Sequence, residues 1–234
     1  MTTTLRERLQ QVRMQITQAA LAAQRAPAGV QLLAVSKTHS AAAIREALAA
    51  GQTAFGESYV QEALVKIAAL ADAPIEWHFI GPIQSNKTAA IAAHFAWVHS
   101  LDRLKIAQRL NDQRAARLPP LNVCLQVNIS GEASKGGVSP AELEALAQAV
   151  HALPRLRLRG LMTIPAPESD PQRQRAPFHQ LRLCLDRLNR QGLALDTLSM
   201  GMSDDLQAAI AEGATIVRIG TAIFGPRASA RALT

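Results

Sequence analysis

A lysine at the end of a predicted strand is the residue with the clearest chemical potential in this sequence. Lys37 closes the segment Gln31–Lys37 and follows an uncharged run that starts at Leu32, which is typical of a buried strand. A lysine at the mouth of a protein interior is partly desolvated, which lowers its pKa from about 10.4 and makes its amine a nucleophile. The chemistry this favours is a Schiff base with a carbonyl compound. The alternative is a lysine whose stem packs on the protein while its ammonium stays in water.

Two later segments have residues suited to binding an anion. Gly201 ends one predicted strand and is followed by Ser203, whose hydroxyl is expected at a helix N-cap. Gly220 ends another predicted strand, and Thr221 opens TAIFG, a short predicted helix whose N–H groups would face an anion. Loops of this kind bind phosphate in many α/β barrels. The alternative is that these are ordinary turn and capping residues.

A ligand with an aldehyde at one end and a phosphate at the other satisfies both features. Pyridoxal 5′-phosphate (PLP) is such a molecule. Arg218 lies two residues before Gly220 on the same strand face, from which it could reach the pyridine nitrogen. Because arginine keeps its protons and cannot accept one, it would donate a hydrogen bond to that nitrogen, leaving the nitrogen unprotonated and the ring a weaker electron sink. A structural ion pair is the alternative role for Arg218.

The elements that must position these residues alternate regularly between strand-like and helical segments. Strands are expected at 31–37, 53–57, 76–81, 95–100, 122–129, 157–164, 196–201 and 216–220. Helices are expected at about 5–25, 41–50, 59–70, from 85, 103–117, from 139, 172–191 and from 203, and a long loop at about 165–177. Strict alternation implies a parallel sheet, because parallel strands need crossover connections.

Eight such units predict one α/β domain over residues 1–234, a single (β/α)8 (TIM) barrel preceded by an extra helix at about 5–25. The alternative is an open, doubly wound sheet. Such a sheet usually has a GxGxxG turn after its first strand, whereas here the first strand is followed by SKTHSA. In a barrel, the site lies at the C-terminal ends of the strands.

Composition excludes several other classes of protein. The net charge is +7, but only 3% of the residues are aromatic and no nucleic-acid-binding signature is present, which argues against a nucleic-acid partner. No apolar run reaches the roughly 20 residues of a membrane span, and the charged N-terminus does not resemble a signal peptide, so we expect a cytoplasmic protein with no membrane partner. Cys124 and Cys184 are expected to be buried thiols, His78 an interior histidine, and no metal site is expected.

A series of motifs spanning most of the chain from about residue 30 resembles the pyridoxal phosphate homeostasis protein family. The matching segments are AVSKTHS (34–40), FGESYVQEA (55–63), WHFIGPIQSNK (77–87), VNIS with the following KGG (127–137), GLMTIP (160–165), SMGMSDD (199–205) and VRIGTAIFG (217–225). Each is weak alone, but together and in this order they are highly specific.

The resemblance implies a barrel similar to the N-terminal domain of alanine racemase, with PLP as cofactor. Lys37 matches the lysine that carries PLP as a Schiff base, and Arg218 matches the arginine facing the pyridine nitrogen. The other cofactor-binding positions it implies are Ser58, Met162, Ser199, Met200, Gly201, Ser203, Gly220 and Thr221. Ser58 stands where the family motif has asparagine, which puts in doubt any contact made by that side chain.

The same resemblance implies a role in PLP and amino-acid homeostasis, as a carrier or regulator without established catalysis. The alternative is a PLP-dependent amino-acid racemase of low activity. A two-base racemase needs a second acid or base opposite the lysine. The one tyrosine, Tyr59, is expected at the start of a helix, and with nine residues after Gly225 we expect no second domain to supply another. We therefore expect a monomer that hands PLP to apo PLP-dependent enzymes, with Lys87 and Lys135 as possible anion or second PLP sites at the rim.

Overall fold

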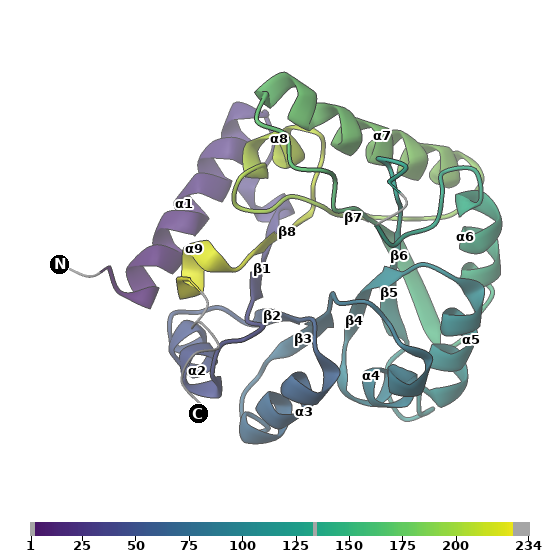
Figure 1. Ribbon diagram of the computed structural model, residues 1–234, viewed down its shortest axis with the longest axis horizontal. Helices are drawn as coiled ribbons and strands as arrows, with labels where there is room; N and C mark the ends of the chain where they lie inside the picture. Colours follow the sequence, from purple (N-terminus) through teal and green to yellow (C-terminus); the bar gives the residue numbers. More distant parts are fainter. Residues whose placement is uncertain (1–2, 133–134, 227–234) are drawn as a thin grey trace.

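The computed structural model describes residues 3–132 and 135–226, and in it eight parallel strands close into a barrel in the order β1 to β8 (Figure 1). The strands are β1 Gln31–Val35, β2 Ala54–Glu57, β3 Glu76–Phe79, β4 Trp97–Leu101, β5 Leu121–Gln126, β6 Leu156–Met162, β7 Thr197–Ser199 and β8 Ile216–Ile219. The last strand pairs with the first, with Leu33 opposite Arg218. This pairing confirms the predicted barrel and rules out the open sheet.

Helices surround the barrel, and the N-terminal helix takes the place left open after the last strand. The helices are α1 Leu5–Ala22, α2 Ala41–Ala49, α3 Val60–Ala69, α4 Thr88–His94, α5 Leu104–Gln113, α6 Leu143–His151, α7 Pro171–Arg190, α8 Leu206–Ala211 and α9 Thr221–Phe224. Because β8 is followed by the four-residue α9, the eighth position of the outer ring is filled by α1, which packs on α8 and α9 (Figure 1). A capping box between Thr4 and Glu7 starts α1.

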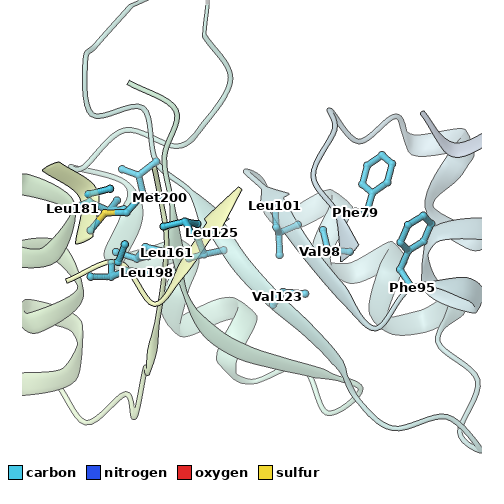
Figure 2. Close-up of a cluster of buried hydrophobic side chains, with 14 of the residues drawn as sticks. Phe79, Phe95, Val98, Leu101, Val123, Leu125, Leu161, Leu181, Leu198 and Met200 are labelled. Atoms are coloured by element: carbon cyan, nitrogen blue, oxygen red, sulfur yellow. The ribbon is translucent and has the colours of Figure 1, made fainter. Parts of the chain in front are cut away.

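Alternation along the strands divides the buried side chains between two cores. The inner core fills the barrel and contains Leu33, Ala54, Trp97, Cys124, Met162 and Ile216. The outer core lies between the strands and the helices, and Figure 2 shows part of it, with Leu161 and Leu198 on one side and Phe79 and Phe95 on the other. Because side chains alternate along a strand, every second residue from an inner-core member faces the barrel interior. This parity determines which predicted site residues can share a cavity.

Two predicted helix starts are wrong because a capped turn precedes each helix. The helix expected to be capped by Ser203 begins at Leu206, with Asp205 as N-cap. Asp205 Oδ1 instead accepts a hydrogen bond from the Met202 N–H at 2.6 Å, which closes a turn over 202–205. Similarly, Ser139 Oγ accepts from the backbone N–H of residue 142 at 3.3 Å, and α6 starts only afterwards.

The loop predicted at 165–177 is shorter than expected. Helix α7 already begins at Pro171. A proline is suited to the first position of a helix because it has no backbone N–H, and the N–H groups of the first turn have no acceptor within the helix. The helix also contains Pro177, within its first two turns. Within the described part of the chain, no helix combines the length and apolar character that crossing a bilayer requires.

Candidate functional site

Lys37 lies directly after β1, at the C-terminal end of the barrel. The strand ends at Val35, which shares the inward parity of the inner-core residue Leu33, and Lys37 lies two residues further on, in the turn that leads to α2. The turn that follows is well fixed. Thr38 adopts φ 67° and donates its N–H to Glu62 Oε1 at 2.5 Å, while the His39 ring stacks on Phe224 of α9 with centroids 4.9 Å apart. The half-buried Lys37 side chain is therefore presented from a rigid support.

A buried ionic cluster behind this turn was not found by the sequence analysis. Glu57, at the end of β2, accepts from Ser36 Oγ at 2.6 Å and from Lys66 Nζ at 2.7 Å. The Lys66 ammonium also donates to Ser36 O at 2.8 Å and to Glu62 Oε1 at 2.6 Å. These bonds occupy all three Lys66 protons, so this buried amine is committed to the ionic cluster. The sequence signal that could have revealed part of this cluster is the spacing of Glu62 and Lys66, which lie four residues apart and therefore on one face of α3.

Arg218 is buried inside the barrel and is held by main-chain carbonyls and a hydroxyl. Nη1 donates to the carbonyl oxygen of Ser199 at 2.6 Å and to its Oγ at 2.9 Å, and Nη2 donates to Thr163 O at 2.9 Å. Burial lowers the pKa of Arg218 to about 10, so the side chain remains charged at neutral pH. Arg218 thus donates its hydrogen bonds to neutral oxygen atoms of Ser199 and Thr163, and not to a carboxylate as in the structural ion pair considered as the alternative.

The two glycine-containing loops lie next to the end of β1 and the start of α8. A Cβ on Gly220 would lie 3.2 Å from Val35 O, so this glycine lets the end of β8 approach β1 closely. The first N–H groups of α9, beginning with Thr221, have no acceptor within the helix. Gly201 adopts φ 96°, and a Cβ there would lie 2.5 Å from Cβ of Ala209 in α8, so only glycine fits.

The remaining predicted site residues divide between the inner face and other surfaces. Met162 and Ser199 are fully buried inside the barrel, and Ser58 is half-buried where β2 approaches Gly81. Met200 is different, because its side chain belongs to the outer core and lies next to Leu181 of α7 in Figure 2. A ligand inside the barrel could contact Met200 only through its backbone.

Ser203 is exposed on an outer surface of the barrel. It lines a cavity of about 780 Å³ between α1 and α8 that also involves Gln15 and Gln18 of α1. The hydroxyl is thus not at a helix N-cap, and the anion-binding role predicted for this residue would rest on its backbone. At the rim, Lys135 pairs with Glu132 at 3.2 Å.

Tyr59 is the N-cap residue of α3 and is 54% exposed. His78 is buried inside the barrel as an interior histidine, in agreement with the sequence analysis. Cys124 is buried there too, and burial raises the pKa of its thiol to about 12. Cys184 on α7 is only partly buried, less than the sequence analysis expected.

Comparison with known proteins assigns the chain to a family. The family model described as alanine racemase, N-terminal domain, matches residues 9–228. A pyridoxal phosphate homeostasis protein of Pseudomonas aeruginosa is 66% identical over 224 residues, which cover 96% of each chain. The chain belongs to the pyridoxal phosphate homeostasis protein family. A family member from Escherichia coli is 58% identical over 222 residues, covering 94% of this chain and 95% of the relative.

Solved structures extend the comparison to the fold. PipY of Synechococcus elongatus, determined with PLP bound, is 42% identical, with a TM-score of 0.81 over 95% of this chain and 100% of PipY. Alanine racemase of Corynebacterium glutamicum is 20% identical, with a TM-score of 0.67, and the match covers 95% of this chain but 62% of the racemase. The second likeness establishes a shared barrel fold and nothing about activity.

Proposed function

We propose that the chain is a single PLP-binding barrel that holds the cofactor on Lys37 and acts in PLP and amino-acid homeostasis in the cytoplasm. The observation that carries the proposal is the pairing of β1 with β8, which brings Lys37, two residues beyond β1, to the same end of the barrel as Arg218 and Gly220. The bound PLP of a structure that is 42% identical supports the choice of ligand.

The residues present fit such a cofactor. When bound, PLP supplies an aldehyde that condenses with a lysine amine to a Schiff base, with loss of water. Lys37 is the amine we assign to that end, because it lies directly after β1 at the C-terminal end of the barrel, next to β8, the strand that carries Arg218. The first N–H groups of α9 and the close approach permitted by Gly220 suit a phosphate at the other end. Gly201, Ser203 and Met200 would contribute through the backbone of the adjacent loop.

Arg218 would face the ring nitrogen as a hydrogen-bond donor. A guanidinium has no acceptor and keeps its proton, since its pKa of about 10 lies well above neutrality. Its hydrogen bonds to Ser199 and Thr163 hold it in place before any ligand arrives. The arrangement favours binding over the strong electron withdrawal that a carboxylate partner would give. Met162 and Ser58 would complete the wall of the same cavity.

A carrier or regulator is favoured over the alternative, a racemase of low activity. The relatives are named homeostasis proteins. A two-base racemase needs a second acid or base across from Lys37, and Tyr59 is exposed at the N-cap of α3. Apo PLP-dependent enzymes are the partners we propose for the released cofactor, and a monomer is the form we propose for the carrier.

The test combines colour, covalent trapping and substitution. The purified protein is incubated with PLP, its visible absorption is recorded, and the adduct is reduced with borohydride and located by peptide mapping. We expect the adduct on Lys37, loss of the band in Lys37→Ala, and no change in Lys105→Ala, which replaces an exposed lysine on α5. An adduct confined to other lysines would refute the site. Racemisation of alanine at enzymatic rates by the loaded protein would refute the carrier role in favour of the racemase.

A further inference from the structure

An unbroken chain of hydrogen-bonded side chains crosses the barrel interior from its N-terminal opening to Arg218. Glu76 Oε1 lies 2.8 Å from His78 Nε2, and His78 Nδ1 lies 2.9 Å from His99 Nε2. His99 Nδ1 lies 2.7 Å from Ser199 Oγ, which accepts from Arg218 Nη1 at 2.9 Å. We call Glu76, His78, His99 and Ser199 the relay.

Burial separates the relay from solvent at every position except its first. His78, His99 and Ser199 are fully buried, whereas the Glu76 side chain is 43% exposed at the start of β3. The relay draws its members from β3, β4 and β7 and ends on β8, so it forms only in the closed barrel. The Trp97 ring stacks on His78 with centroids 5.4 Å apart and fixes its plane.

The proton positions follow from the two ends of this chain. The hydrogen bond from His78 lowers the pKa of Glu76, which is therefore ionised and accepts from His78 Nε2–H. Burial lowers the pKa of His78, so the ring is neutral and its other nitrogen, Nδ1, is an acceptor. His99 must then donate through Nε2–H.

The same reasoning continues to Arg218. Burial holds the pKa of His99 well below its usual value, so this ring is also neutral and its Nδ1 accepts from the Ser199 hydroxyl. The Ser199 oxygen is left with its lone pairs toward Arg218, which can only donate. Every bond therefore points the same way, from the buried cation toward the half-exposed carboxylate.

We propose that the relay is a positioning device that makes Glu76 the remote counter-charge of Arg218 and so sets the electronic environment of a cofactor ring facing that arginine. Only the part of this inference that concerns the cofactor rests on the proposed function. The ordering of protons is a property of the protein without ligand. Glu76, His78 and His99 are thus positioning residues, acting through Ser199 and Arg218.

The first experiment measures the histidine tautomers in the protein without PLP. Long-range ¹H–¹⁵N correlation spectra at pH 7 distinguish Nε2–H, Nδ1–H and doubly protonated rings. We expect the neutral Nε2–H tautomer for both His78 and His99. A doubly protonated ring or an Nδ1–H tautomer at either position would overturn the relay.

The second experiment compares variants loaded with PLP. Glu76→Gln keeps an acceptor for His78 but removes the charge, and Ser199→Ala removes the hydroxyl that contacts Arg218. We expect both to shift the visible absorption maximum of the bound cofactor. Asp196→Asn is the matched control, because Asp196 pairs with Arg159 at 2.7 Å and its side-chain hydrogen bonds in the described part of the chain go to Arg159 and Thr197, not to the relay. It should leave the maximum unchanged, and thermal unfolding verifies that each variant is folded.

The outcomes separate this inference from the proposed function. Wild-type spectra in Glu76→Gln and Ser199→Ala, with PLP still bound, would overturn the remote effect while leaving PLP binding intact. An equal shift in Asp196→Asn would overturn it too, because any lost negative charge would then suffice. If the unsubstituted protein fails to bind PLP, both the proposed function and the effect of the relay on the cofactor are refuted. The tautomers of His78 and His99 then still show whether the relay itself exists.

Discussion

Lys66 Nζ and Glu57 Oε1 form a 2.7 Å ion pair whose side chains are 6% and 0% exposed, directly behind the turn that carries Lys37. A charge removed from water at this depth is tolerated only because it is paired and hydrogen-bonded. The pair joins α3 to the ends of β1 and β2, since Lys66 also bonds Ser36 O. It therefore couples the stability of the barrel to the position of the candidate nucleophile.

Removing one partner of this pair should cost more than removing both. Lys66→Met leaves the Glu57 carboxylate buried without its cation, and we expect a loss of about 3–5 kcal/mol in the free energy of unfolding. The double variant Lys66→Met/Glu57→Gln should recover most of that loss, because no fully buried charge is then left unpaired; Glu62 loses the same cation, but it is 29% exposed and keeps the hydrogen bond from the Thr38 N–H. Urea unfolding measures both. Equal stability of the single and double variants would contradict the pairing.

Glu212 should make the protein sensitive to acid. Burial alone would raise its pKa, but hydrogen bonds from Arg175 and His179 outweigh burial and lower it below the usual 4.5. A lowered pKa means that Glu212 stabilises the fold above about pH 4.5, and that this stabilisation disappears as the pH falls through the pKa of the folded state. Glu212→Gln should thus be less stable than the wild type at pH 7.

The pH dependence provides the control for that variant. Its deficit in thermal unfolding should shrink as the pH falls below 4.5 and through the lowered pKa of the folded state, since below that pKa the carboxyl group is protonated in the wild type too. A deficit of constant size between pH 7 and pH 3 would mean that packing, and not the charge at the C-terminus of α8, explains the loss.

Gly201→Ala should destabilise the protein more than Gly192→Ala. Both glycines adopt φ 96°, so both variants carry the same backbone penalty, about 1 kcal/mol. At Gly192 the added Cβ meets nothing within 4 Å, whereas at Gly201 it would lie 2.5 Å from Cβ of Ala209. We expect an additional cost of about 1–3 kcal/mol at Gly201 and weaker retention of PLP. Equal melting temperatures of the two variants would contradict this, because they would mean that α8 shifts away from the added Cβ with no loss of stability.

The two thiols should differ in reactivity. The thiolate is the reactive form, and at pH 8 a thiol with a pKa of about 12 is ionised in about one molecule in ten thousand. Iodoacetamide should therefore modify the partly buried Cys184 well before Cys124, as followed by mass spectrometry. In urea the two should react at similar rates. Early modification of Cys124 in the folded protein would indicate that the barrel interior opens.

Much of the fold and part of the site follow from local sequence patterns. Strand–helix alternation predicts the barrel, and parity along two strands predicts that Lys37 and Arg218 face the same interior. Met200 has the opposite parity to Ser199, so the same rule applied to β7 would have directed its side chain to the helices. The start of α6 was misplaced because Ser139 caps a turn and not the helix, and the start of α8 was misplaced because a turn closed by Asp205 comes before that helix.

The polar interior could not be predicted in the same way. His78 and His99 lie 21 residues apart in sequence, and Ser199 lies 100 residues beyond His99. Their contact depends on the diameter of the closed barrel and on rotamers that only packing decides. The Glu57–Lys66 pair likewise needs the fixed distance between α3 and the end of β2, which no spacing rule supplies.

The position of α1 in the outer ring has a consequence for synthesis on the ribosome. Helix α1 is synthesised before every strand of the barrel and exposes an apolar stripe that includes Leu9 and Val12, whereas its binding surface on α8 and α9 is synthesised only after β7. The nascent chain must therefore keep this stripe from premature association until β8 has joined β1. Chaperone occupancy on stalled nascent chains should be greatest before this final step and should fall once the ring is complete.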